Sequence, residues 1–134
     1  MSRRKIESHL DCIAYLSETE GTLTQIEKKE SKQEKVIREY ANRHNIKVVK
    51  TVRRNGFSID DVYRQFEIMA NMIRKHQIDG VIVTRSWVLS KDDELIYSLI
   101  GKIKNAGGSF VTTTEGRLGL ELEGKPNAKK KKSI

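Results

Sequence analysis

Four short apolar runs, each separated from the next by a segment of helical periodicity, constrain the fold of this chain most strongly. The runs that predict strands are residues 11–16, 46–52, 79–84 and 109–113. The segments that predict helices are residues 23–44, 59–77 and 91–106. Strands that alternate with helices indicate a mostly parallel sheet covered by helices on both faces. The sequence therefore predicts an α/β fold, in which a sheet of four to five strands forms the middle layer of a three-layer α/β/α structure.

The first predicted helix has two parts of different character. Its later part places Val36, Ile37, Tyr40 and Ala41 at helical spacing on one face, which indicates packing against the sheet. Its earlier part, residues 27–34, is almost wholly charged. We expect this earlier part to project into solvent.

The two ends of the chain differ in composition from the middle. Residues 117–123 alternate apolar and non-apolar side chains and predict an edge strand. Residues 124–134 contain the only proline and a lysine run, and predict a disordered Lys-rich tail. Residues 1–10 form a basic N-terminal arm, so the folded domain is expected to span residues 11–123.

The charge balance favours a polyanionic partner. The 134 residues include 26 Lys and Arg against 18 Asp and Glu, which gives a net charge of +8. Part of the excess lies in the tail, where Lys129, Lys130, Lys131 and Lys132 predict either an electrostatic anchor for nucleic acid or a solubilising segment.

Cysteine and histidine usage indicates a cytoplasmic protein without a metal or other cofactor. The single cysteine, Cys12, cannot form an internal disulfide, which fits a reducing compartment, and it is expected to lie in the core. His9, His44 and His76 lack metal-ligand spacing. No stretch approaches the roughly 20 apolar residues that a membrane span needs, so we expect no membrane association.

Functional groups in a parallel sheet collect on the loops after the carboxyl ends of the strands, here residues 17–22, 53–58, 84–90 and 112–116. Arg53, Arg54, Arg85 and Lys91 are candidate DNA-phosphate contacts on or beside these loops, although Arg53 and Arg54 equally fit a solvated strand end. Trp87 is a candidate anchor for a protein partner, or a ring packed over the end of the sheet.

Several of these segments share an order and spacing with one known family. Tyr15 ends the first strand, Gly56 and Ser58 follow the second, and the run 78–83 leads through a short loop to Leu89-Ser90-Lys91-Asp92. Over about residues 11–116 this arrangement resembles the serine recombinases, the resolvase and invertase family. Gln33 also matches a glutamine of that family.

The resemblance implies a catalytic pattern that this chain does not keep. Family members end the first strand with Tyr-x-Arg-x-Ser, in which the serine attacks the DNA phosphate and the arginine helps to hold it. Here Ser17 stands at the arginine position and Thr19 at the serine position. Asp61, Val88 and Lys91 stand where further arginines are implied, and of these only Lys91 keeps the charge. Because lysine lacks the bidentate fork of arginine, we expect strand cleavage to be lost.

Three functions follow from these observations. The first is a DNA-associated or protein-binding accessory or regulatory factor, of a mobile element or phage, whose partner is DNA or another protein such as a recombinase. The second is an active recombinase or nicking enzyme that uses Thr19 as the nucleophile, or Ser17 if this residue aligns with the catalytic serine. In it, Arg53, Arg54 and Arg85 substitute for the missing arginines. The third is an α/β module that binds nucleic acid without sequence preference. Each of them is compatible with a homo-oligomer.

Overall fold

A five-stranded sheet with the strand order β3-β2-β4-β5-β6 forms the centre of the molecule. The computed structural model describes residues 9–18, 20–54, 58–114 and 116–118, without the side chains of Trp87, Arg117 and Leu118. The elements are β2 (Leu10–Leu16), α1 (Leu23–Arg43), β3 (Ile46–Arg53), α2 (Ile59–Arg74), β4 (Gly80–Val83), η1 (Ser86–Val88), α3 (Asp93–Asn105), β5 (Ser109–Thr112) and β6 (Gly116–Leu118). The predicted arm lies outside this description except for its last two residues, and the predicted tail lies outside it entirely.

The strand pairing confirms the predicted class. Strands β3, β2, β4 and β5 pair in parallel, and β6 pairs antiparallel with β5. β6 begins one residue before the edge strand predicted at 117–123, and residues 119–123 of that prediction lie outside the described part. The result is the mostly parallel α/β sheet that the alternation of strands and helices predicts.

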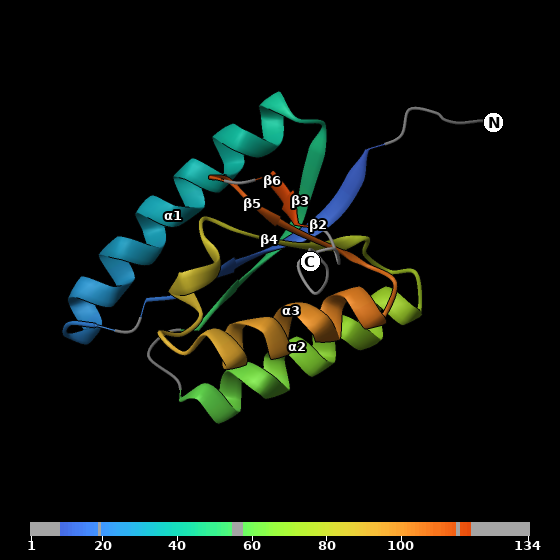
Figure 1. The fold of residues 1–134 in the computed structure, drawn as a ribbon. Helices are drawn as coiled ribbons and strands as arrows, with labels where there is room; N and C mark the ends of the chain where they lie inside the picture. The colour runs from blue at the N-terminus through green and yellow to red at the C-terminus, as the bar shows by residue number, and fades with distance from the viewer. Residues whose placement is uncertain (1–8, 19, 55–57, 115, 119–134) are drawn as a thin grey trace, which may run out of the picture.

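The described helices cover the two faces of the sheet unequally. Helix α1 lies on one face, while α2 and α3 lie side by side on the other (Figure 1). The larger core lies under α2 and α3, where Phe66, Val81 and Leu99 are fully buried. The smaller core lies under α1 and contains Ile37 and Cys12, which confirms the predicted burial of the cysteine.

Capping side chains explain where the helices begin. Thr22, Ser58 and Asp92 each accept a hydrogen bond from a backbone N–H in the first turn of α1, α2 and α3 respectively. Because Asp92 caps α3, this helix begins two residues after the predicted start at 91. Helix α2 ends at Arg74 rather than 77, and His76 then takes a positive φ of 62°.

The expectation that residues 27–34 project wholly into solvent is wrong. Glu30 is fully buried and Gln33 is 9% exposed. Both lie on the helix face that also carries Ile26, Ile37 and Ala41, since these positions recur at three- and four-residue steps. The side chains of Lys28, Lys29 and Lys32 are exposed as expected.

Two glycines provide a matched test of the packing. A Cβ on Gly80 would lie 2.2 Å from the Ser109 carbonyl oxygen, whereas a Cβ on Gly101 in α3 would meet nothing within 4 Å. We expect Gly80→Ala to lower the free energy of unfolding by about 1–3 kcal/mol or more, because the backbone of β5 must move. Gly101→Ala should raise it by up to about 1 kcal/mol, since alanine is the better helix former. Urea denaturation of both variants checks the pair, and equal effects would contradict the described contact between β4 and β5.

Candidate functional site

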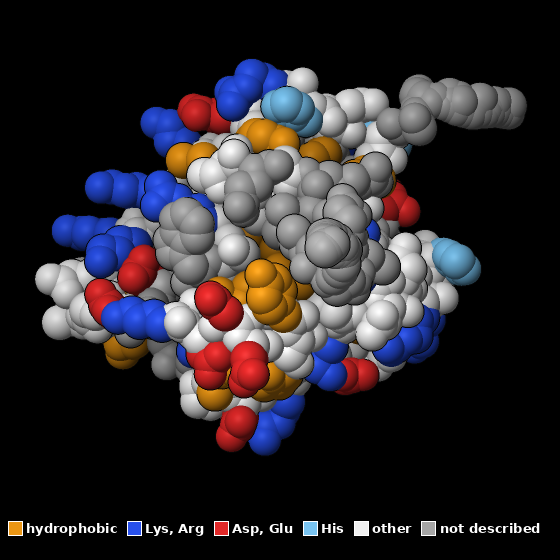
Figure 2. Space-filling model, viewed as in Figure 1, with side chains coloured by type: hydrophobic (Ala, Val, Ile, Leu, Met, Phe, Trp, Pro, Cys, Tyr) orange, Lys and Arg blue, Asp and Glu red, His pale blue; other side chains and the backbone are white. Residues whose placement is uncertain are grey.

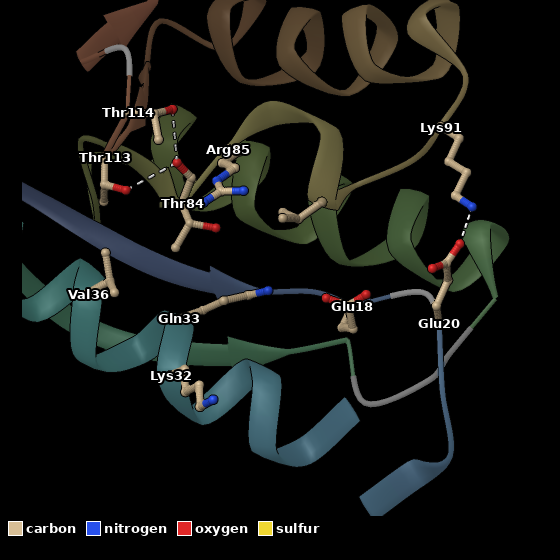
Figure 3. Close-up of a pocket in the computed structure, with 11 residues that line it drawn as sticks. Glu18, Glu20, Lys32, Gln33, Val36, Thr84, Arg85, Lys91, Thr113 and Thr114 are labelled. Atoms are coloured by element: carbon tan, nitrogen blue, oxygen red, sulfur yellow. Dashed lines mark hydrogen bonds and ion pairs between the residues drawn. The ribbon is translucent and has the colours of Figure 1, made fainter. Parts of the chain in front are cut away.

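A groove of about 500 Å³ opens at the carboxyl ends of β2, β4 and β5 (Figure 3). Its lining comes from α1 and from the loops that follow these three strands, and consists of Glu18, Glu20, Lys32, Gln33, Val36, Thr84, Arg85, Val88, Lys91, Thr113 and Thr114. Three of the four predicted functional loops therefore meet here. The hydroxyls of Thr113 and Thr114 both donate to the Thr84 carbonyl and join two of these loops.

Ser17 is fully buried behind two residues of this lining, Gln33 and Val88, to which it is hydrogen-bonded. Its hydroxyl donates to the Val88 carbonyl oxygen at 2.7 Å, across 71 residues of sequence. Its backbone N–H donates to the Gln33 side-chain oxygen at 3.0 Å, and the Gln33 amide donates back to the Ser17 carbonyl at 2.7 Å. The polar groups of Ser17 are thus engaged within the protein.

Arg54 connects the loop after β3 to the same place. It is 8% exposed, and its guanidinium donates to the Leu89 carbonyl at 3.0 Å and lies 3.4 Å from the Ser17 hydroxyl. Its backbone N–H donates to the Leu16 carbonyl at 2.8 Å. A solvated strand end is therefore not the environment of Arg54, and the guanidinium ties together the ends of β2, β3 and β4.

Arg53 points to α1 rather than into the groove. Its guanidinium lies 3.6 Å from the buried Glu30 carboxylate and 3.5 Å from that of Glu34. A carboxylate as buried as Glu30 needs such a counter-charge, because its desolvation costs several kcal/mol (roughly) when it is unpaired. Sequence reasoning missed Glu30, although its place at helical spacing between Ile26 and Gln33 could have revealed it.

Tyr15 and Gln65 add further hydrogen bonds beside Arg53. The Tyr15 hydroxyl donates to the Gln65 side-chain oxygen, and the Gln65 amide donates to the Arg53 carbonyl at 3.3 Å. Burial of the phenol raises the pKa of Tyr15 well above its ordinary value, and the nearby Arg54 guanidinium only partly offsets this effect. Gln65 is a second residue that the sequence patterns did not single out.

At the outer rim, Lys91 forms an ion pair with Glu20, shown by the dashed line in Figure 3. The hydrogen bond from Lys91 lowers the pKa of Glu20, and the same contact raises the pKa of Lys91. Both side chains are exposed, so solvent screens the pair. Together with Glu18, Lys32 and Arg85, these residues give the groove a mixed charge rather than a positive one.

Some candidate residues lie outside the part of the chain that the structure describes. Thr19, the Trp87 side chain and Lys129, Lys130, Lys131 and Lys132 fall outside the described residues. Within the described ranges, no group of three or more His, Cys, Asp or Glu side chains is arranged to hold a metal ion. In the same part of the chain, no helix combines the length and apolar character needed to cross a membrane.

Comparison with known proteins identifies the class of this fold and site. The family model described as "Resolvase, N terminal domain" matches residues 17–129. The chain belongs to this family. Among solved structures it is similar to the one titled "Crystal Structure of the N-terminal Catalytic Domain of TP901-1 Integrase", with a TM-score of 0.60 and 19% sequence identity over 79% of this chain and 78% of that one. No curated protein matches. The resemblance to the serine recombinases read from the sequence is thereby confirmed.

Substitution of Arg54 tests whether this guanidinium holds the strand ends together. We expect Arg54→Lys to lower the free energy of unfolding by about 1–3 kcal/mol, because the lysine side chain ends one atom short of Nη1, the nitrogen that contacts both the Leu89 carbonyl and the Ser17 hydroxyl. Arg64→Lys is the control, since Arg64 is an exposed residue of α2. Its effect on urea denaturation should stay within about 0.5 kcal/mol. An Arg54→Lys variant as stable as this control would show that the contacts contribute little.

The raised pKa of Tyr15 predicts a pH effect on stability. The unfolded chain ionises Tyr15 near pH 10 (roughly), while the folded protein resists this ionisation, so the free energy of unfolding should fall as pH rises above that value. Tyr15→Phe removes this titration and should show a shallower fall between about pH 9 and pH 11. Urea denaturation of both proteins at each pH measures the difference. Parallel curves would contradict the burial of the phenol.

Proposed function

We propose that this resolvase-family domain does not cleave DNA and acts by binding, as a DNA-associated or protein-binding accessory or regulatory factor. The observation that carries the proposal is the position of the Ser17 hydroxyl, which is buried and donates to the Val88 carbonyl. A nucleophile must reach phosphorus along an open path, and this hydroxyl faces protein.

Proton transfer from Ser17 also lacks an acceptor. Within the described residues, the partners of its hydroxyl are a backbone carbonyl and the Arg54 guanidinium. Neither can act as a general base, since a carbonyl oxygen is too weak a base and a guanidinium is already protonated. The hydrogen-bonding pattern therefore supports a structural role for this serine.

The residues at the implied arginine positions further support the loss of chemistry. Asp61 stands where the family resemblance implies an arginine, and its carboxylate accepts a hydrogen bond from Arg64 at 2.7 Å. Val88 replaces a second arginine, and the charge of Lys91 is shared with Glu20. Loss of one donor to a developing oxyanion costs about 3 kcal/mol, so several losses together would raise the barrier prohibitively.

One observation favours a second candidate, an active recombinase or nicking enzyme. The Arg54 guanidinium lies 3.4 Å from the Ser17 hydroxyl, which places a cation beside a potential nucleophile. For Ser17 to attack DNA, the loop that contains Val88 would have to move away and release the hydroxyl.

A covalent-adduct assay separates the two candidates. The purified protein is incubated with supercoiled and with nicked DNA and run on a denaturing gel beside Ser17→Ala and Thr19→Ala. We expect no shifted band for any of the three proteins. An active serine recombinase on the same DNA is the positive control. A shifted band that disappears in one of the two variants would overturn the proposal and identify the nucleophile.

A further inference from the structure

The outward face of α1 carries a row of positive side chains. Lys28, Lys32, Lys35 and Arg43 are all exposed, and we call this set the basic ridge. By helical geometry they lie within about 80° of one another, and the ridge is about 22 Å long. Glu39 is the one acidic residue among them. In Figure 2, Lys and Arg side chains project along the length of α1.

The charge of the ridge is not neutralised by the rest of the described structure. None of its four cations forms an ion pair with another described residue. Several other cations are paired: Arg64 with Asp61, Arg74 and Lys102 with Glu67, and Lys91 with Glu20. Because unpaired charges project the stronger field, the ridge is a favourable place for a polyanion to dock.

A groove beside the ridge extends this positive surface to the edge of the sheet. It has a volume of about 390 Å³ and is lined by Arg38, Ala41, Asn42, Ile46, Lys47 and Val48. The lining thus contains two cations and no acidic residue. The nearby Glu34 carboxylate is shared between Arg38 and Arg53, so it offsets only part of this charge.

We propose that the basic ridge, together with the Arg38–Lys47 groove, is the surface through which this chain binds the phosphate backbone of double-stranded DNA. This inference rests on the DNA association of the proposed function and gives it a place on the molecule. About 22 Å of duplex carries about 13 phosphate charges, which is ample for four to six cations. Lysine-to-phosphate contacts read no bases, so the binding is independent of sequence.

The character of the ridge favours duplex DNA over other acidic partners. Single-stranded nucleic acid is held largely by stacking on aromatic rings, and the ridge carries none. A helix that lies on an acidic membrane buries an apolar face in the lipid, whereas the apolar face of α1 packs against the sheet. A rigid duplex backbone needs neither feature.

The test compares two double variants that remove the same charge. Lys28→Gln/Lys35→Gln alters the ridge without touching the strand-end groove. Lys75→Gln/Lys104→Gln removes one cation at the C-cap of α2 and one in the last turn of α3, on the other sheet face. Glutamine keeps the helix propensity of lysine, and circular dichroism checks the fold. Arg85→Gln probes the strand-end groove. Fluorescence anisotropy with a labelled duplex of about 25 base pairs gives Kd between 50 and 200 mM salt for each full-length protein.

We expect the ridge variant to bind about tenfold more weakly at about 100 mM salt, and the slope of log K against log salt to become shallower by about 2. Lys75→Gln/Lys104→Gln and Arg85→Gln should bind like the wild type. Equal losses in both double variants would mean that only net charge matters, and a loss confined to Arg85→Gln would move the site to the strand-end groove. Either result overturns the ridge while DNA association stands. If the wild-type chain does not bind the duplex, DNA association is overturned as well, whether or not the chain binds acidic lipid vesicles.

Discussion

The paired hydrogen bonds between the Gln33 amide and the backbone of Ser17 fix the geometry of the whole sheet end. They join α1 to Ser17, the first residue after β2, and both groups are buried. A buried polar group left without its partner costs about 1–3 kcal/mol, so this pair strongly favours one position of the Ser17 backbone. That position directs the Ser17 hydroxyl to Val88 and lets Arg54 bridge to Leu89. The contacts that stabilise the strand ends therefore engage the groups that phosphoryl transfer would need.

Positive charge is distributed differently in the strand-end groove and on the outward side of α1. At the carboxyl end of the sheet, where α/β proteins commonly bind ligands, Lys91 is paired with Glu20, Arg54 is buried, and the acidic Glu18 also lines the groove. A row of four exposed cations without ion pairs to other described residues lies on the outward side of α1, the one described α-helix on its face of the sheet. A resolvase-family fold with this row of unpaired cations on α1 fits the binding role that we propose.

The local features of the fold could be predicted from the sequence, whereas the contacts between distant segments could not. Periodicity located every described α-helix and strand to within a few residues, because it reflects which face of each element is buried. The same periodicity places Glu30 on the buried face of α1, but its charge led us to expect a solvent-exposed side chain. Arg54 and Ser17 lie 37 residues apart, and no local pattern indicates that their side chains meet. Such pairs depend on the strand order β3-β2-β4-β5-β6, which only the folded chain defines.

Native-state hydrogen exchange at the Ser17 amide tests the closed strand end most directly. This N–H is held by the Gln33 side chain rather than by a neighbouring strand, so its protection reports on that contact alone. If Ser17 is held as described, its amide should exchange as slowly as the amides of the central strand β4, for which we expect exchange only on global unfolding. Exchange as fast as in an exposed loop would show that this end of the sheet opens in the native state. In that case the Ser17 hydroxyl would be available for chemistry, and the central claim would be contradicted.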